Sequence, residues 1–207
     1  MLPVIEGFGG KPVISIDTYK ATIAREAIAR GASIINDVSA LGYDPPLATV
    51  VTETGAAIVL MHNRGRSRDM YQEARYRDLM AAVTAELSDA IARAEAAGIS
   101  RDAIILDPGL GFAKQARHSY QALALLGRLA SLGRPLLSGP SRKSFLKAAL
   151  GDVPPAERDW GTAAAVTASV LAGAHIVRVH AVREMAQVVR VADRVAAAAA
   201  GDAPDAV

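Results

Sequence analysis

Residues 136–145 have the sequence LLSGPSRKSF. An apolar pair leads into Ser138, and a tight turn then brings Arg142 and Lys143 to the start of a helical pattern. The first N–H groups of a helix are unpaired and its dipole is positive at that end, so anions bind there. The stretch therefore predicts a strand, a turn and a helix with an anion site at the junction. An isolated Arg-Lys pair is more often solvated surface charge, so this interpretation depends on the rest of the chain.

The same alternation of strand and helix recurs along the chain. Six short apolar runs are typical of strands buried on both faces of a parallel sheet, and helical patterns separate them. The predicted strands are 13–16, 33–35, 57–61, 103–106, 135–138 and 176–179, and the predicted helices are 20–30, 46–53, 76–97, 119–132, 141–150, 162–172 and 183–199. Such βα units indicate a TIM barrel or an open doubly wound sheet. No glycine-rich dinucleotide fingerprint follows a strand, which argues against a Rossmann domain.

Length and composition indicate one globular domain. The 207 residues can bury a full core, with 51% hydrophobic and 21% charged residues. We expect a single domain over residues 1–207, beginning with the end of a helix in residues 1–10 and closing with a frayed tail over residues 200–207.

The charge balance and residue usage narrow the partners. The net charge is only +2 and no basic run is present, so a nucleic-acid partner is not expected. The absence of cysteine excludes disulfides and thiolate metal sites. No apolar run reaches membrane-spanning length, and no targeting segment precedes the first glycines. These features predict a cytoplasmic protein with no membrane partner.

Polar side chains follow every predicted strand. They are Asp17, Asn36 with Asp37, His62, Asp107, Ser138 with Lys143, and Arg178 with His180. Singly, each has an ordinary explanation, because Asp caps helices, Asn and Asp form turns, and most lone histidines are not catalytic. The carboxyl ends of parallel strands share one face, where α/β enzymes place their active sites. We therefore expect these residues to converge on one site.

The side chains at these ends divide into two chemical groups. Asp17, Asn36 and Asp107 supply acceptors that suit a flat heterocycle with ring N–H and amino groups. Arg142, Lys143, Arg178 and His180 suit phosphate, pyrophosphate or a carboxylate. Arg178 lies inside an apolar run, where a buried guanidinium would need an anionic partner, and His180 points to the same side of a strand. The pattern predicts a ligand that is part heterocycle and part anion.

Taken together, these motifs resemble those of the dihydropteroate synthase family, the folate-pathway enzymes that sulfonamides inhibit. The matching stretches are 15–20 (SIDTYK), 34–38 (IINDV), 60–62 (LMH), 107–114 (DPGLGFAK), 139–145 (GPSRKSF) and 178–180 (RVH). They occur in the family's order, each at a strand end, and the resemblance extends from Leu2 to about Val195.

The resemblance implies an eight-stranded TIM barrel and a transferase. Its reaction joins 6-hydroxymethyl-7,8-dihydropterin pyrophosphate to 4-aminobenzoate, giving 7,8-dihydropteroate and pyrophosphate. Pyrophosphate leaves in a largely dissociative step with no side-chain nucleophile, and the catalytic group would be Asp107, Lys143, Arg178 and His180.

The resemblance also implies binding roles, and a homodimer formed through late helices. Pterin would be held by Asp17, Asn36, Met61, Asp107, Gly139 and Lys143, pyrophosphate by Arg178 and His180, and 4-aminobenzoate by Phe112, Arg142, Lys143 and Ser144. Mg²⁺ would assist the departing pyrophosphate, although the family's usual Asn ligand has no counterpart here, so no metal ligand is expected in this chain.

The sequence departs from the family at its beginning. Two loops that close over aminobenzoate and pyrophosphate in the family, with the first two strands, have no match here. We therefore expect an N-terminally truncated barrel of about six βα units that binds pterin weakly and turns over little.

Three alternatives remain open at this point. A non-catalytic pterin-binding remnant would agree with the unmatched loops but not with the intact site residues. A pterin-dependent methyltransferase barrel would share the Asp/Asn/Asp pocket but lack the Ser-Arg-Lys turn and the Arg-x-His pair. An aldolase-like phosphate-binding barrel would need a Schiff-base lysine inside a strand, and no predicted strand has one.

Overall fold

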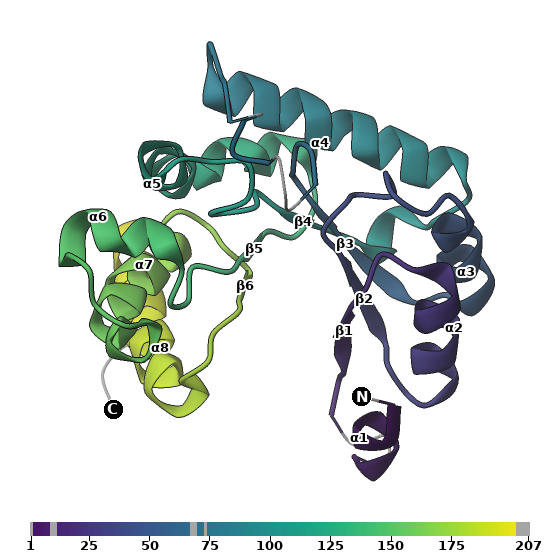
Figure 1. The fold of residues 1–207 in the computed structure, drawn as a ribbon. Coiled ribbons are helices and arrows are strands. Elements are labelled where there is room, and N and C mark those ends of the chain that lie inside the picture. The colour runs from purple at the N-terminus through teal and green to yellow at the C-terminus, as the bar shows by residue number, and fades with distance from the viewer. Residues whose placement is uncertain (1, 9–11, 67–69, 73, 202–207) are drawn as a thin grey trace.

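The computed structural model describes residues 2–8, 12–66, 70–72 and 74–201, and strands alternate with helices through them (Figure 1). The strands are β1 (Ser15–Asp17), β2 (Ile34–Asp37), β3 (Ala57–Met61), β4 (Ile104–Asp107), β5 (Leu137–Ser138) and β6 (Ile176–Val177). The α-helices are α1 (Leu2–Gly7), α2 (Ala21–Ala29), α3 (Pro46–Thr54), α4 (Leu79–Ala96), α5 (Ala116–Ala124), α6 (Lys147–Leu150), α7 (Asp159–Leu171) and α8 (Val182–Ala200). Short 3₁₀ helices are η1 (Arg101–Ala103), η2 (Leu126–Leu132), η3 (Ser144–Leu146) and η4 (Pro155–Glu157).

The strands form a parallel sheet whose order follows the chain. β1 to β4 pair consecutively, with Asp17 opposite Asn36 and Met61 opposite Asp107. A bridge from Leu106 to Leu136 leads to the pair β5–β6. The helices lie outside this curved layer (Figure 1), and within the described ranges the outer edges of β1 and β6 pair with no further strand. The α/β class and the partial barrel predicted from the sequence are confirmed.

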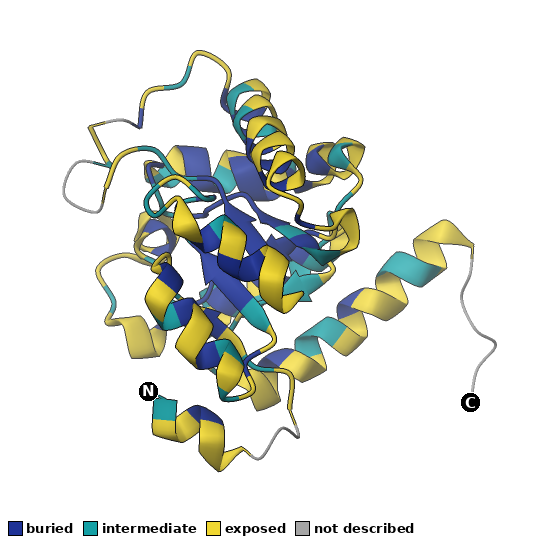
Figure 2. Ribbon diagram, turned by 90° about the vertical axis from the view of Figure 1, so that its right-hand side faces the viewer, coloured by how far each residue is buried: buried dark blue, intermediate teal, exposed yellow. Residues whose placement is uncertain are grey.

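The core lies between the strands and the inner faces of the helices. Ile35, Leu60 and Leu106 are fully buried, as expected for strands covered on both faces. Leu47 of α3 and Leu87 of α4 are also almost fully buried against them, whereas the outer faces of the helices are exposed (Figure 2). The sheet therefore holds its carboxyl-end side chains on a rigid base.

The last helix, α8, is the most exposed long element. Only Met185 and Ala192 are buried along it, and its main neighbour is α7. The helix continues through Ala200 and ends at Gly201, whose φ of +80° suits glycine. Residues 200 and 201, which were predicted to belong to a frayed tail, are the last residue of α8 and its cap, and residues 202–207 lie outside the described residues. Within the part of the chain that is described, no helix is long and apolar enough to cross a membrane.

Several element boundaries differ from those predicted, most clearly in the second half of the chain. β5 and β6 have two residues each, so Arg178 follows its strand, and its side chain is 60% exposed where a buried position was expected. The predicted helix 119–132 is α5 followed by η2. The predicted helix 141–150 begins as a turn and continues as η3 and α6.

Candidate active site

A cavity of about 310 Å³ opens at the carboxyl ends of the strands. Its lining combines predicted site residues with three others, and comprises Asn36, Val38, Met61, Asp107, Phe112, Gly139, Ser141, Lys143, Arg178, Val179 and His180. These residues come from β2, β3 and β4 and from the segments after β4, β5 and β6. The predicted convergence of strand ends on one site is therefore found in the structure.

Asn36 and Asp17 meet at the end of the β1–β2 pair. The Nδ2 atom of Asn36 donates to Oδ1 of Asp17 at 2.7 Å, as their register allows. The buried Oδ1 atom of Asn36 has no hydrogen-bond partner among the residues that the structure describes. A buried acceptor without a partner is costly, so this atom is available to a donor on a ligand.

Asp107 lies at the base of the cavity, almost fully buried. Its Oδ1 accepts from the backbone N–H of Gly109 at 2.7 Å. Burial raises the pKa of Asp107, and the charge of Lys143 and the Gly109 N–H oppose that rise. Asp107 thus combines an acceptor for a ligand N–H with negative charge held in a low dielectric.

Lys143 enters the cavity from the turn after β5. Its Nζ donates to the carbonyl of Leu110 at 2.6 Å and lies 4.7 Å from the centre of the Phe112 ring. Burial lowers the pKa of Lys143, and the charge of Asp107 opposes this. Lys143 therefore joins the turn after β5 to the loop after β4, and the Phe112 ring covers it.

The cationic end of the cavity is formed by the segment after β6. The side chain of Arg178 reaches Oδ2 of Asp17 at 2.5 Å, and His180 Nδ1 lies 2.8 Å from Oγ of Ser141. Ser141 also accepts from the backbone N–H of His180 at 3.2 Å. Arg178 and His180 are the sequence neighbours of Val179, and both line the cavity. Two such side chains at one end of a cavity are what an anion site requires.

Comparison with known proteins decides the family. The sequence profile described as "Pterin binding enzyme" matches residues 1–180. The chain belongs to the pterin-binding enzyme family. The resemblance inferred from the six motifs is thereby confirmed.

Relatives in the pterin-binding enzyme family include named dihydropteroate synthases. The chain is 43% identical over 180 residues to that of Synechocystis sp., covering 87% of this chain and 62% of the relative. It is 41% identical over 196 residues to the dihydropteroate synthase of Bacillus subtilis, and the match covers 93% of this chain and 66% of the relative. This chain thus spans less than two thirds of the length of these relatives.

Solved structures of the same family confirm the barrel. A Yersinia pestis dihydropteroate synthase with a sulfonamide drug complex matches at a TM-score of 0.91 and 36% identity, covering 95% of this chain and 72% of that one. A Thermus thermophilus dihydropteroate synthase in complex with 6HMPPP matches at a TM-score of 0.88 and 36% identity. The match covers 93% of this chain and 76% of that one. The six strands observed here therefore form part of the family's TIM barrel.

Two residues expected in the family's aminobenzoate site do not line the cavity. The guanidinium of Arg142 binds both carboxylate oxygens of Asp159 at 2.8 Å, and Ser144 begins η3. Asp17 is also absent from the lining, although it contacts two residues that line it, Asn36 and Arg178. The aminobenzoate role of Arg142 and Ser144 remains a prediction.

Some residues that line the cavity were not selected from the sequence. Val38, Ser141 and Val179 line the cavity, and each lies within or beside a quoted motif, so their position next to selected residues was the available signal. His62, by contrast, follows β3 as predicted but lies outside the cavity, bound to Glu86 and Lys114.

Proposed function

We propose that this chain carries the pterin and pyrophosphate sites of a dihydropteroate synthase. The reaction would join 6-hydroxymethyl-7,8-dihydropterin pyrophosphate to 4-aminobenzoate and release pyrophosphate. The observation that carries the proposal is the unpartnered, buried Oδ1 of Asn36 in a cavity that it shares with Asp107, Lys143, Arg178 and His180. A heterocycle with N–H groups would satisfy Asn36 and Asp107, and an attached anion would meet Arg178 and His180.

The residues divide the chemistry between the two ends of the cavity. As the C–O bond from the pterin methylene to pyrophosphate breaks, positive charge develops on the pterin, and the carboxylate of Asp107 stabilises it. Arg178 and His180 stabilise the charge on the departing pyrophosphate. The amine of 4-aminobenzoate then forms the C–N bond and loses a proton, while Lys143 and Phe112 contact the bound reactants.

Mg²⁺, which the family resemblance implies, has no fitting ligand set here. Within the described ranges, no group of three or more His, Cys, Asp or Glu residues could hold a metal ion. Asp17, the carboxylate nearest to the anion end, is already bound to Asn36 and Arg178. The described residues therefore do not fit this ion. The homodimer and the cytoplasmic location expected from the sequence stay predictions.

Pterin binding tests this function directly. The chain is titrated with 6-hydroxymethyl-7,8-dihydropterin pyrophosphate, and the Asp107→Asn variant is compared with Asp152→Asn at an exposed carboxylate. We expect saturable binding that Asp107→Asn weakens by at least about tenfold and Asp152→Asn leaves unchanged, because removing a partner of a buried donor costs about 1–3 kcal/mol. Equal binding by the two variants would contradict the proposed site.

An activity assay distinguishes a working synthase from a chain that binds pterin without catalysing the reaction. Incorporation of labelled 4-aminobenzoate into dihydropteroate is measured with the Lys143→Ala variant as the control. Product above this control supports the synthase. Pterin binding without product from the folded chain supports the non-catalytic alternative instead.

A further inference from the structure

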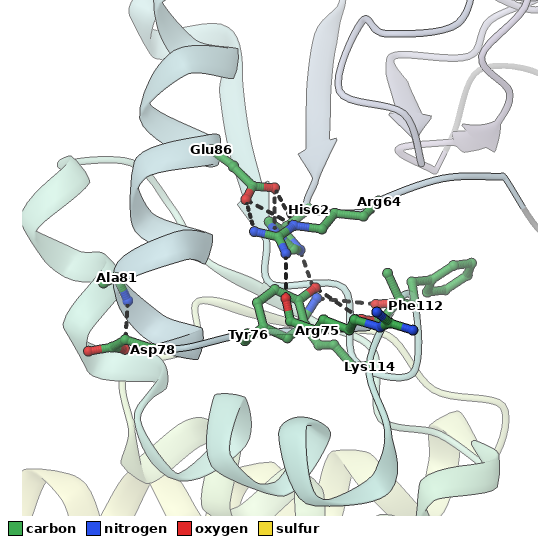
Figure 3. A network of polar contacts seen from close by, with 10 residues as sticks. His62, Arg64, Arg75, Tyr76, Asp78, Ala81, Glu86, Phe112 and Lys114 are labelled. Carbon is green, nitrogen blue, oxygen red and sulfur yellow. Dashed lines mark hydrogen bonds and ion pairs between the residues drawn. The ribbon is translucent and has the colours of Figure 1, made fainter. Parts of the chain in front are cut away.

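A buried polar network lies beside the cavity, between its loop after β4 and helix α4 (Figure 3). Its centre is Lys114, 1% exposed, whose Nζ lies 2.7 Å from Nδ1 of His62 and donates to the carbonyl of Phe112 at 3.2 Å. His62 is 3% exposed. Neither side chain lines the cavity, so neither contacts a ligand there.

The contacts of His62 set its tautomer. An ionised carboxylate can only accept, so Nε2 of His62, which faces Glu86, carries the hydrogen, and Nδ1 accepts from Nζ of Lys114. Nε2 lies 3.1 Å from Oε2 of Glu86 on α4, which is the acceptor that this tautomer needs. Burial lowers the pKa of His62, which favours the neutral ring. A chain of directed hydrogen bonds thus runs from α4 to the carbonyl of Phe112.

A second branch returns to the same loop. Arg64 binds Glu86, and its guanidinium also donates to the carbonyl of Arg75 and lies 4.3 Å from the centre of the Tyr76 ring. The hydroxyl of Tyr76 donates to the carbonyl of Ala113 at 2.9 Å (Figure 3). Two consecutive carbonyls, of Phe112 and Ala113, are therefore held by the network.

The backbone held in this way is not a relaxed one. Ala113 has a φ of +45°, a conformation that non-glycine residues adopt only when their surroundings enforce it. On the other side of this residue pair, the Phe112 ring covers Nζ of Lys143. The position of the ring over Lys143 therefore depends on contacts made behind the loop.

We propose that Lys114 is a positioning residue for the aminobenzoate side of the site, acting through the Phe112 carbonyl to fix the ring that faces Lys143. This inference rests on the proposed function. A lysine that served stability alone would, when replaced, weaken the binding of both substrates together.

The first experiment compares two ligands on the Lys114→Met variant. Lys147→Met is the matched control, because Lys147 is half-exposed on α6 and paired with Asp152 away from the cavity. The chain is titrated with pterin pyrophosphate, and then with 4-aminobenzoate at saturating pterin and pyrophosphate. We expect Lys114→Met to weaken 4-aminobenzoate binding about tenfold and pterin binding less than about threefold, from the loss of one charged hydrogen bond. Equal losses for the two ligands, or no loss, would overturn the inference.

A second readout needs no ligand. In a Trp160→Phe background, Phe112→Trp introduces one indole at the ring position, and its quenching by acrylamide reports how firmly the ring is covered. Quenching should increase on adding Lys114→Met, and to a smaller extent on adding Glu86→Gln, but not on adding Lys147→Met. Unchanged quenching in both network variants would contradict positioning. Failure of the unaltered chain to bind pterin would overturn the proposed function, while this readout would still test Lys114.

Discussion

The Nη2 atom of Arg178 lies 2.5 Å from Oδ2 of Asp17, and this contact joins residues 161 positions apart in the sequence. The contact joins the end of β1 to the segment after β6, which are the two edges of the open sheet. The guanidinium is expected to bind pyrophosphate and the carboxylate to face pterin. Each therefore neutralises a charge that a ligand would otherwise meet.

Asp17→Asn should release Arg178 for anions. Both side chains are more than half exposed, so the ion pair contributes no more than about 1 kcal/mol to stability, and unfolding should change little. Titration with inorganic pyrophosphate should show binding a few-fold tighter than in the unaltered chain, with a steeper dependence on salt. Glu53→Gln, which breaks the exposed Arg25–Glu53 pair, is the control. Weaker pyrophosphate binding in Asp17→Asn would contradict the competition.

Thr162→Val should disturb the turn that carries Lys143. The buried hydroxyl of Thr162 accepts from the N–H of Arg142, whose φ is +57°, and Arg158 binds the carbonyl of the same residue. Losing this acceptor should lower the free energy of unfolding, measured in urea, by about 1–3 kcal/mol and should weaken pterin binding.

Thr167→Val on the same helix is the matched control for this change. The hydroxyl of Thr167 donates within α7, to the carbonyl of Ala163. We expect Thr167→Val to lower the free energy of unfolding by less than about 1 kcal/mol and to leave pterin binding unchanged. Equal effects of the two substitutions would show that the contact with the turn has no special role.

Gly109→Ala should be far more damaging than Gly133→Ala. Both glycines have similar φ values, +68° and +63°, so both substitutions carry the same backbone strain of about 1 kcal/mol. A Cβ at Gly109 would lie 2.0 Å from the carbonyl oxygen of His62, whereas nothing lies within 4 Å at Gly133. Thermal unfolding should show that Gly109→Ala costs at least about 2 kcal/mol more. Similar melting temperatures would disprove the close contact.

The Glu86 side chain should contribute stability that acid removes. Burial alone would raise its pKa, but hydrogen bonds from His62 and Arg64 lower the pKa of Glu86 to about 2. A carboxyl whose pKa is lower in the folded state than in the unfolded state adds to the free energy of unfolding. This contribution is fully present above the unfolded pKa and is lost as the pH falls through the folded pKa. Since the Glu86 side chain is 37% exposed, we expect its contribution to the free energy of unfolding to be on the order of 1 kcal/mol. Urea unfolding of Glu86→Gln should differ from the unaltered chain at pH 7, and the difference should shrink as the pH falls from about 4.5 toward 2.

Lys114 should also make stability rise with pH, but in a higher pH range than Glu86. Burial lowers the pKa of Lys114 to about 7, while the charge of Asp107 opposes the shift. The other charged or titratable groups that act on it or contact it are Glu86, Lys143, Arg64, His62 and His118. Above pH 7 the unfolded chain holds the lysine proton and the folded chain has lost it, so stability should rise with pH by up to about 1.4 kcal/mol per unit until the unfolded lysine titrates. Urea unfolding between pH 7 and 9.5 should show this rise in Lys147→Met but not in Lys114→Met.

The sequence located most of the sheet and the site because strand ends carry their own signals. A buried parallel strand is an apolar run, and the first polar residue after it, such as Asp107, lies on the functional face. The lengths of β5 and β6 were overestimated, because Val179 continues an apolar pattern after strand pairing has ended. Arg178 was therefore predicted to be buried.

Contacts between distant segments could not be read from the sequence. Arg142 lies in a motif that suggests an anion site, but its partner is Asp159, whose position depends on how α7 packs. Lys114 belongs to a recognised stretch, yet its contact with His62 requires two neighbouring loops to meet above the sheet. Residue type indicated which groups were available, and only the fold determined which of them pair.

The strand order has a consequence for how the chain is made. Strands β2, β3, β4 and β6 each pair with the strand before them, and an isolated bridge between Leu106 and Leu136 links β4 to the residue before β5, so each βα unit leaving the ribosome can join an edge that is already formed. Folding can thus follow translation, and the contact of Arg178 with Asp17, which joins the two ends of this order, waits for the last unit. Until then each intermediate presents a growing strand edge, which is the point where nascent chains on neighbouring ribosomes could pair with one another.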